Sequence, residues 1–351
     1  MDEARRSRQR PRGGALMGLR WLGLFALLLL ATVVIAFGFG RFPLGAAEIV
    51  RFFMAAAGIH GMEEQRYETL RNLIIDIRYP RIAAAVLIGA ALASAGAAFQ
   101  AVFRNPLVSP GLLGVLAGAA FGASIGILMS GSWVVVQVCA FAAGLLAVLV
   151  GLGIANLFGS ASIIMLVLGG VISSALFTSL LTIVKYVADP QSELPVIVYW
   201  LMGNMGMIRT EQLTFMALPV LIGVVLLSLM GRALDALSMG DDEARTLGIP
   251  VTALRYAVIG LATLISAITV SAVGMVGWVG LIIPHVARLI VGPSNGLLIP
   301  ASALLGATFL VAADIAARSV ASIEIPIGIV TELLGIPVFV LVLSRARKGW
   351  V

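Results

Sequence analysis

The fold of this chain is decided by residues 105–184, which read NPLVSPGLLGVLAGAAFGASIGILMSGSWVVVQVCAFAAGLLAVLVGLGIANLFGSASIIMLVLGGVISSALFTSLLTIV. These 80 residues contain no Asp, Glu, Lys, Arg or His. Such a stretch suits lipid, where each buried charge costs roughly 3 kcal/mol or more. Because one crossing needs about 20 apolar residues, the stretch predicts about three consecutive membrane spans. The chain is therefore a polytopic membrane protein.

The composition of the whole chain agrees with a membrane protein. Hydrophobic residues make up 60% of the sequence and charged residues only 11%, far from a soluble domain. The 39 glycines favour close packing of helices through small side chains. The single cysteine, Cys139, excludes a disulfide framework. The net charge of +6 lies mainly in short basic tails, which indicates membrane topology and not a nucleic-acid partner.

Windows without charge predict the positions of the spans. The central stretch divides at residues 130–132 and near residues 156–162, which gives three spans. The window 256–287 has 32 residues and is interrupted by three glycines, so it counts as two. The remaining windows are residues 21–40, 82–103, 212–231, 289–313 and 325–344.

The basic tails predict the orientation. Residues 1–20 and the C-terminal end are both rich in arginine, so both termini should be cytoplasmic and the number of spans even. We therefore predict an all-α fold with ten transmembrane helices in a single transmembrane domain, residues 1–351. Counting 256–287 once gives nine spans, and reading the first window as a signal peptide breaks the parity. Residues 46–71 are too polar to span and are predicted to form an amphipathic helix or loop on the outer surface.

Two charged segments stand out at opposite ends of the predicted second span. Before it, residues 76–81 read DIRYPR, in which Arg78 and Arg81 flank an X-Pro step. These arginines are either interfacial anchors or a fixed cation pair for a carboxylate partner. After it, residues 104–114 read RNPLVSPGLLG, and their prolines and glycines predict a sharp turn. Asn105 in this turn could form a polar collar at a pore mouth.

A second cytoplasmic segment, residues 232–255, contains the sequence LSMGDDEARTLGI at 237–249. Ser238 and the acids after it resemble a helix start, and Arg245 lies four residues after Asp241. Gly248 should end the helix. A helix this short is marginal in water, so it is expected to dock on a partner. Its predicted apolar side consists of Leu237, Ala244, Leu247 and Ile249.

Two weaker features leave their alternatives open. Ser174, Thr178 and Thr182 recur every four residues on one predicted span. Their hydroxyls either bond back to their own helix or face a wet pathway. His285, in GLIIPHVAR at 280–288, is either a structural residue or a ligand.

The function classes can be narrowed from the residues alone. Protease-type and esterase-type motifs are missing from the sequence, which disfavours an intramembrane enzyme. An ion-coupled carrier needs buried carboxylates, and only Asp314, Glu324 and Glu332 lie near the membrane, each close to a predicted end. The remaining class is a pathway driven by a partner.

Taken together, the ordered motifs resemble a known family. RYPR, FRNPLVSPGLLGV, GDDEARTLG, GLIIPHVAR, ADIAAR and IPIGIVTELLGIPVF occur in this order over residues 16–348, nearly the whole chain. They resemble the FecCD family, the permease subunits of ABC importers for iron–siderophores, haem and cobalamin. The resemblance implies a fold like that of the cobalamin-importer permease, a homodimer or close heterodimer and a pathway at its interface. It also implies two cytoplasmic ATPase subunits, which bind ATP and magnesium, and a periplasmic or lipid-anchored binding protein.

The resemblance also assigns roles to matched residues. Arg78, Arg81 and Arg318 match the arginines that meet the binding protein, while Asn105 and Leu107 match the cytoplasmic gate. Ser174, Thr178 and Thr182 match the pathway-lining span by position only. The expected ATPase-coupling residues are Ser238, Gly240, Asp241, Glu243, Ala244, Arg245, Leu247 and Gly248. No cofactor and no nucleic acid are expected for this chain, which should lie in the inner membrane among its lipids. Iron–siderophore is the first choice of substrate, with haem, cobalamin and molybdate or tungstate as alternatives.

Overall fold

The computed structural model describes residues 12–59, 61–157 and 162–347, and within this part every regular element is a helix. This confirms the predicted all-α class. The elements are α2 (Arg12–Gly38), α3 (Ala46–Ala56), α4 (Glu64–Arg71), η1 (Asn72–Arg78), α5 (Tyr79–Phe103), η2 (Pro110–Leu113), α6 (Val115–Met129), α7 (Trp133–Leu157), α8 (Ile163–Val187), α9 (Glu193–Leu201), α10 (Thr210–Leu229), α11 (Gly231–Met239), α12 (Asp241–Thr246), α13 (Val251–Val273), α14 (Val279–Val291), α15 (Asn295–Ser319) and α16 (Ile327–Arg347).

Seven helical segments in the described residues are long and apolar enough to cross a membrane. They are Met17–Gly38, Glu64–Phe103, Trp133–Leu157, Ile163–Val187, Thr210–Leu229, Val251–Val273 and Asn295–Ser319. Three shorter apolar helices, Val115–Met129, Val279–Val291 and Ile327–Leu341, occupy the other predicted positions. The 32-residue window does divide, because α13 ends at Val273 and α14 begins at Val279. The number of actual crossings and the side of each terminus stay predictions.

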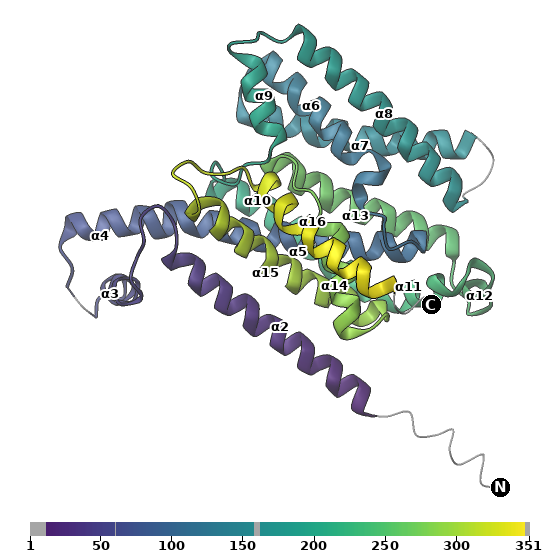
Figure 1. Cartoon of the computed structure of the whole chain (residues 1–351), viewed down its shortest axis with the longest axis horizontal. Helices are drawn as coiled ribbons and strands as arrows, with labels where there is room; N and C mark the ends of the chain where they lie inside the picture. The colour runs from purple at the N-terminus through teal and green to yellow at the C-terminus, as the bar shows by residue number, and fades with distance from the viewer. Residues whose placement is uncertain (1–11, 60, 158–161, 348–351) are drawn as a thin grey trace.

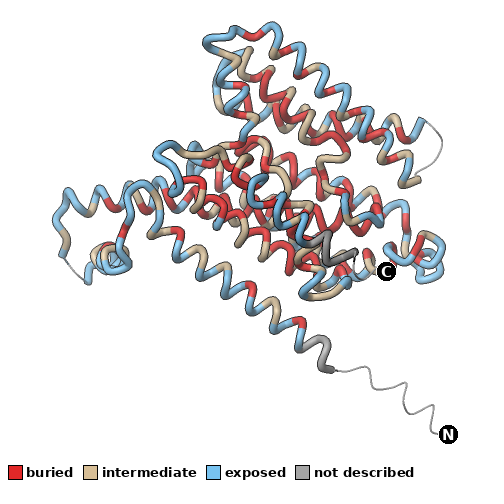
Figure 2. Tube along the Cα trace, viewed as in Figure 1, coloured by how far each residue is buried: buried red, intermediate tan, exposed pale blue. Residues whose placement is uncertain are grey.

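Helix α5 is the centre of the molecule. It contacts α10, α13, α14 and α15, and most of its residues are buried (Figures 1 and 2). Glycine permits the closest of these contacts, since a Cβ atom on Gly96 would overlap the carbonyl of Gly280 and one on Gly89 would overlap that of Gly306. Close approach through small residues is the usual way in which helices pack without a hydrophobic driving force.

Around this centre the other helices form two groups. In Figure 1, α6, α7, α8 and α9 lie together at the top of the view, and α13 joins them to the rest through contacts with α7. Helix α2 lies on the opposite side against α15, with much of its surface exposed. The exposed sides of these peripheral helices carry large apolar residues, which fits contact with lipid or with another subunit.

The predicted surface segment, residues 46–71, differs in part from the expectation. It forms two helices, α3 and α4, and α4 continues through η1 into α5 as one 40-residue segment, Glu64–Phe103. Figure 1 shows α4 projecting in line with α5, with α3 beside it. A small apolar cluster of Leu44, Phe52, Leu70 and Ile74 holds these parts together. This cluster gives the polar segment a fixed position on the bundle.

Candidate functional site

Three arginines that the sequence predicts to face a partner are buried in the isolated chain. Arg78, Arg81 and Arg318 are 3%, 8% and 5% exposed. Arg78 donates hydrogen bonds to the carbonyls of Phe37 and Phe42. Arg318 donates to the carbonyls of Phe39 and Ala36, both at 2.7 Å. These carbonyls belong to the end of α2 and the turn after it, where a helix leaves its last carbonyl groups without internal partners.

Two carboxylates complete this group, which we call the arginine clamp (Arg78, Arg81, Asp314, Arg318 and Glu324). Arg81 Nε lies 2.7 Å from Asp314 Oδ1, and Arg81 Nη1 lies 3.0 Å from Glu324 Oε2. Arg318 Nε lies 3.1 Å from Asp314 Oδ2, and Asp314 is 1% exposed. The clamp therefore joins α2, η1, α5, α15 and the segment after α15. In this chain the three guanidinium groups are engaged internally, because buried charges need partners. Their predicted contact with a binding protein stays a prediction.

At the other end of α5, the structure places three charged residues together. Arg104 Nη2 lies 2.8 Å from Asp241 Oδ1, and Arg255 Nη2 lies 2.8 Å from Asp241 Oδ1 and 2.9 Å from Oδ2. Arg104 ends α5 with a left-handed φ of 49°, Asp241 begins α12, and Arg255 is a 3% exposed residue of α13. We call this group the Asp241 junction. It connects the end of α5 to two consecutive helices, α12 and α13, that are distant from α5 in sequence.

The junction changes the acidity of its carboxylate. Partial burial raises the pKa of Asp241. The hydrogen bond and the charge of Arg255 lower it, and so do the charges of Arg104 and Arg245. These lowering effects are larger together, so the pKa falls below the usual aspartate value. The carboxylate is thus held in its charged form. The sequence analysis did not select Arg104 or Arg255 as functional residues. Their only signal was their position, because each lies at one end of a segment that is predicted to be cytoplasmic.

The predicted coupling segment, residues 238–248, is built differently from the expectation. Ser238 does not cap α12: it lies in the last turn of α11 and donates to the carbonyl of Leu234 at 2.8 Å. Gly240, with φ 148°, occupies the N-cap position instead. Arg245 pairs with Asp242 at 2.8 Å, not with Asp241, because Asp241 already binds two arginines.

The apolar residues of this segment fall into a buried group and an exposed group. Leu237 and Ala244 are fully buried in the chain's own core, so they are unavailable to a partner. Leu247 is 60% exposed, and Glu243 and Gly248 beside it are exposed as well. The predicted four-residue apolar side is therefore wrong for Leu237 and Ala244. The surface left for a partner is α12 with the turn at Leu247 and Gly248.

The loop after Arg104 has the predicted sharp turn. Asn105 Oδ1 accepts a hydrogen bond from the backbone N–H of Leu107 at 2.9 Å, and Leu107 is 57% exposed. An asparagine that bonds the backbone two residues ahead forms a compact turn by itself. Asn105 thus shapes the loop, and Leu107 projects from it.

The predicted polar stripe lies on an accessible side of α8. Thr178 and Thr182 are exposed and Ser174 is half-buried. Thr182 Oγ1 donates to the carbonyl of Thr178 at 2.9 Å, so this hydroxyl follows the self-bonding alternative. A neighbour that the sequence analysis missed, Ser173, is buried and donates to the carbonyl of Ala147 at 2.5 Å, which fixes α8 against α7.

Other features of the described chain offer little chemistry. Among the described residues, no group of three or more His, Cys, Asp or Glu is placed to hold a metal ion, and His285 stands in no such group.

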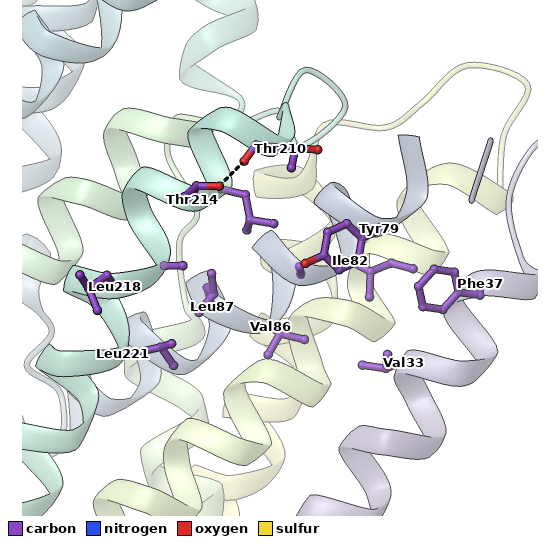
Figure 3. Close-up of a pocket in the computed structure, with 13 residues that line it drawn as sticks. Val33, Phe37, Tyr79, Ile82, Val86, Leu87, Thr210, Thr214, Leu218 and Leu221 are labelled. Carbon is purple, nitrogen blue, oxygen red and sulfur yellow. Dashed lines mark hydrogen bonds between the residues drawn. The ribbon is translucent and has the colours of Figure 1, made fainter. Parts of the chain in front are cut away.

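An open groove of about 810 Å³ lies between α2, α5 and α10. Figure 3 shows Val33, Phe37, Val86 and Leu87 around it, with the Thr214–Thr210 hydrogen bond at one side. Its lining suits an acyl chain better than a polar solute.

Comparison with known proteins identifies the family of this arrangement. The model of the FecCD transport family matches residues 28–345. The chain is 38% identical over 326 residues to the molybdate import permease MolB of Haemophilus influenzae, covering 92% of this chain and 95% of that one. It is 34% identical over 322 residues to a probable iron chelatin permease of Helicobacter pylori, covering 92% and 97%. It is 37% identical over 280 residues to the vitamin B12 import permease BtuC of Escherichia coli, covering 78% and 84%.

A solved structure agrees with these sequence matches. It is an inward-facing conformation of a metal-chelate type ABC transporter, 35% identical to this chain, with a TM-score of 0.82 and coverage of 92% and 98%. The apolar helices and these relatives together indicate a multi-pass membrane protein of the ABC importer class. The match over most of the chain leads to one conclusion: this protein belongs to the FecCD transport family.

Proposed function

We propose that this chain is the permease subunit of an ATP-driven importer that moves an iron chelate, a siderophore complex first, into the cytoplasm. The observation that carries this proposal is the likeness over 92% of the chain to a metal-chelate type ABC transporter. In the proposed assembly two copies of the chain form a homodimer in the inner membrane. Each copy crosses the membrane ten times, with both termini in the cytoplasm, and the pathway runs between the copies.

The substrate is the finer part of the proposal. Relatives of similar identity have names that refer to molybdate, iron chelatin and vitamin B12. Haem, cobalamin and molybdate or tungstate therefore stay alternatives to the siderophore complex. The iron chelate is preferred because a sequence relative and the structural neighbour both point to metal chelates.

ATP hydrolysis in this proposal belongs to two separate cytoplasmic subunits, which bind ATP and magnesium. Their docking surface is α12 with Glu243, Leu247 and Gly248. Its exposure supports this role, and so does the Asp241 junction, which ties the docking helix to the loop of Asn105 and Leu107. Movement of α12 would thus reach the proposed cytoplasmic gate. Ser174, Thr178 and Thr182 are proposed to line the pathway from the accessible side of α8. In this proposal the Thr182 hydroxyl keeps its bond to the Thr178 carbonyl.

On the opposite face a periplasmic or lipid-anchored binding protein is proposed to deliver the substrate. The arginine clamp holds the turn after α2 and the segment after α15 in place. It is proposed to shape the docking surface through these two segments. A direct role for Arg78, Arg81 and Arg318 requires the binding protein's carboxylates to exchange with the internal partners. Salt dependence of docking would accompany such exchange, because exposed ion pairs are screened.

The proposal is tested in proteoliposomes. The permease is reconstituted with its ATPase subunits and binding protein, and the uptake of a radioactive ferric siderophore is measured. Uptake should require ATP inside and binding protein outside, and the permease alone should hydrolyse no ATP. Accumulation by the permease alone, driven by a proton or sodium gradient without ATP, would instead establish the alternative class, an ion-coupled carrier.

A further inference from the structure

Helix α16 carries one carboxylate on a side that the rest of the chain leaves open. The helix packs against α14 and α15, and in Figure 1 it crosses the front of the bundle. Its free side exposes Leu333, Ile336 and Val340 at 66%, 45% and 59%. Glu332 is exposed on this helix too. The other neighbours of Glu332 on this side are apolar, so the carboxylate requires a specific explanation.

The depth of Glu332 argues against lipid as its surroundings. Arg345, near the other end of α16, lies thirteen positions further along the helix, which corresponds to roughly 20 Å. If Arg345 lies at the membrane boundary, Glu332 lies about 20 Å into a hydrocarbon core about 30 Å thick, nearer the outer end of the span but still within the apolar layer. Carboxylates at such depth face the protein interior or a water-filled cavity.

The protein interior of a single chain does not supply the partner. Among the described residues, the Glu332 carboxylate has no hydrogen bond and no ion pair. The carboxylate lies close to the turn between α13 and α14, where a Cβ added to Gly277 would lie 3.6 Å from Glu332 Oε1. Non-helical backbone at membrane depth occurs where it is buried in protein or lines a water-filled cavity. The turn and the carboxylate therefore point to the same wet space.

We propose that Glu332 lines the aqueous pathway between two copies of the chain and selects its cargo by charge. This inference rests on the proposed function, since the second copy supplies the opposite wall and a second Glu332. These two carboxylates would attract cations and repel anions in a confined path, as charged side chains lining a channel do. The cargo class is then a neutral or cationic metal chelate or corrinoid, and oxyanions such as molybdate are disfavoured.

Cysteine labelling of the assembled transporter measures this field without knowledge of the substrate. The chain has one cysteine, so Cys139→Ser gives a background without thiols. Ile336→Cys is placed one helical turn from Glu332, on the same side of α16. The rates of reaction with a cationic and an anionic methanethiosulfonate reagent are then compared. Leu27→Cys, at a 65% exposed position of the apolar α2, is the lipid-facing control.

The expected result is labelling of the Ile336→Cys variant, no labelling of the Leu27→Cys variant and faster reaction of the cationic reagent. Adding Glu332→Gln to the Ile336→Cys variant should lower the ratio of cationic to anionic rates about tenfold, and adding Glu332→Lys should invert it. Each unit charge at about 6 Å in water changes each rate roughly threefold, in opposite directions for the two reagents.

The possible failures are distinguishable. No reaction of the Ile336→Cys variant with either reagent would place this side of α16 outside an aqueous path and overturn the proposed interface as well. Reaction of that variant with a ratio unchanged by Glu332→Gln would overturn only the charge selection. Loss of the dimer in Glu332→Gln, with the ratio unchanged in the remaining dimer, would show that Glu332 holds the copies together and would also overturn the selection.

Discussion

Arg104 Nη2 and Asp241 Oδ1 lie 2.8 Å apart, although 137 positions separate the two residues in the sequence. The pair joins the end of α5, where the Asn105 loop begins, to the first residue of α12. Asp241 also binds Arg255, so α12 is held by two cations from two different helices. One of these bonds secures α12 to its own neighbour α13, while the other extends across to the loop.

Arg104→Gln should separate the loop from α12 without detaching α12. Arg255 still holds Asp241, and the Arg104 side chain is 35% exposed, so the loss of unfolding free energy should be about 0–1 kcal/mol. We expect the ATPase subunits to co-purify normally while binding-protein-stimulated transport falls about fivefold or more, as a coupling of about 1 kcal/mol implies. Arg20→Gln is the control, because this arginine is exposed on α2, outside the Asp241 junction and the proposed docking surface. Equal transport in both variants would contradict the link.

The acid limit of stability should report on the Asp241 junction. Because the folded state lowers the pKa of Asp241 below 3.8, the junction stabilises the fold above the unfolded pKa. This contribution is lost as the pH falls through the lowered value. The melting temperature of the wild type in detergent should therefore exceed that of Asp241→Asn by a constant margin between about pH 5 and 8. The margin should shrink only below the ordinary aspartate range, and shrinkage near neutral pH would be inconsistent with the pairing.

Arg81→Gln should destabilise the fold itself. The change removes two of the ion pairs of the arginine clamp and leaves Asp314, 1% exposed, with Arg318 alone. Breaking a buried pair costs about 3–5 kcal/mol, which thermal unfolding of the purified permease would detect. Arg71→Gln, in the same segment but exposed, should have little effect. If the Arg81→Gln variant keeps the wild-type melting temperature and loses only affinity for the binding protein, the main role of the clamp is docking and not stability.

Leu247→Glu should release the ATPase subunits and leave the permease folded. The side chain is 60% exposed, so a charge is tolerated by the chain but not by an apolar partner cleft. Ala244→Glu is the contrasting variant, because Ala244 is fully buried and a carboxylate there should lower the yield of folded protein. Co-purification with the ATPases and size-exclusion profiles separate the two effects. Normal co-purification of Leu247→Glu would refute this docking surface.

The helices and their breaks were predictable from sequence because their signals are local. Runs of apolar residues set the helices, and the breaks at residues 130–132 and 274–278 coincide with glycines. The continuation of α4 into α5 was not predictable from hydropathy, since residues 64–71 are polar. Their helix is held by the buried Leu70 and Ile74, which only the folded chain reveals.

The candidate sites were predictable as residues but not as contacts. The sequence selects Arg81 and Asp241 as candidates, and the structure gives each an internal ion pair with a residue 233 and 137 positions away. Local spacing suggested the wrong partner for Arg245 and a cap role for Ser238, because helix rules describe neighbours three or four residues apart. A long-range ion pair overrides these rules when it removes a buried charge from isolation.

The continuous segment Glu64–Phe103 leads to a constraint on how the gene can vary. The arginine clamp holds this helix at Arg81, and Arg104 holds its far end. Between these points, Gly89 and Gly96 pack against two other helices. One inserted residue would turn one end about 100° against the other and lengthen the helix by about 1.5 Å. No single insertion or deletion there can keep all four contacts in register. Changes in chain length should accumulate in the turns between helices, whereas the span from Arg81 to Arg104 should keep a constant number of codons.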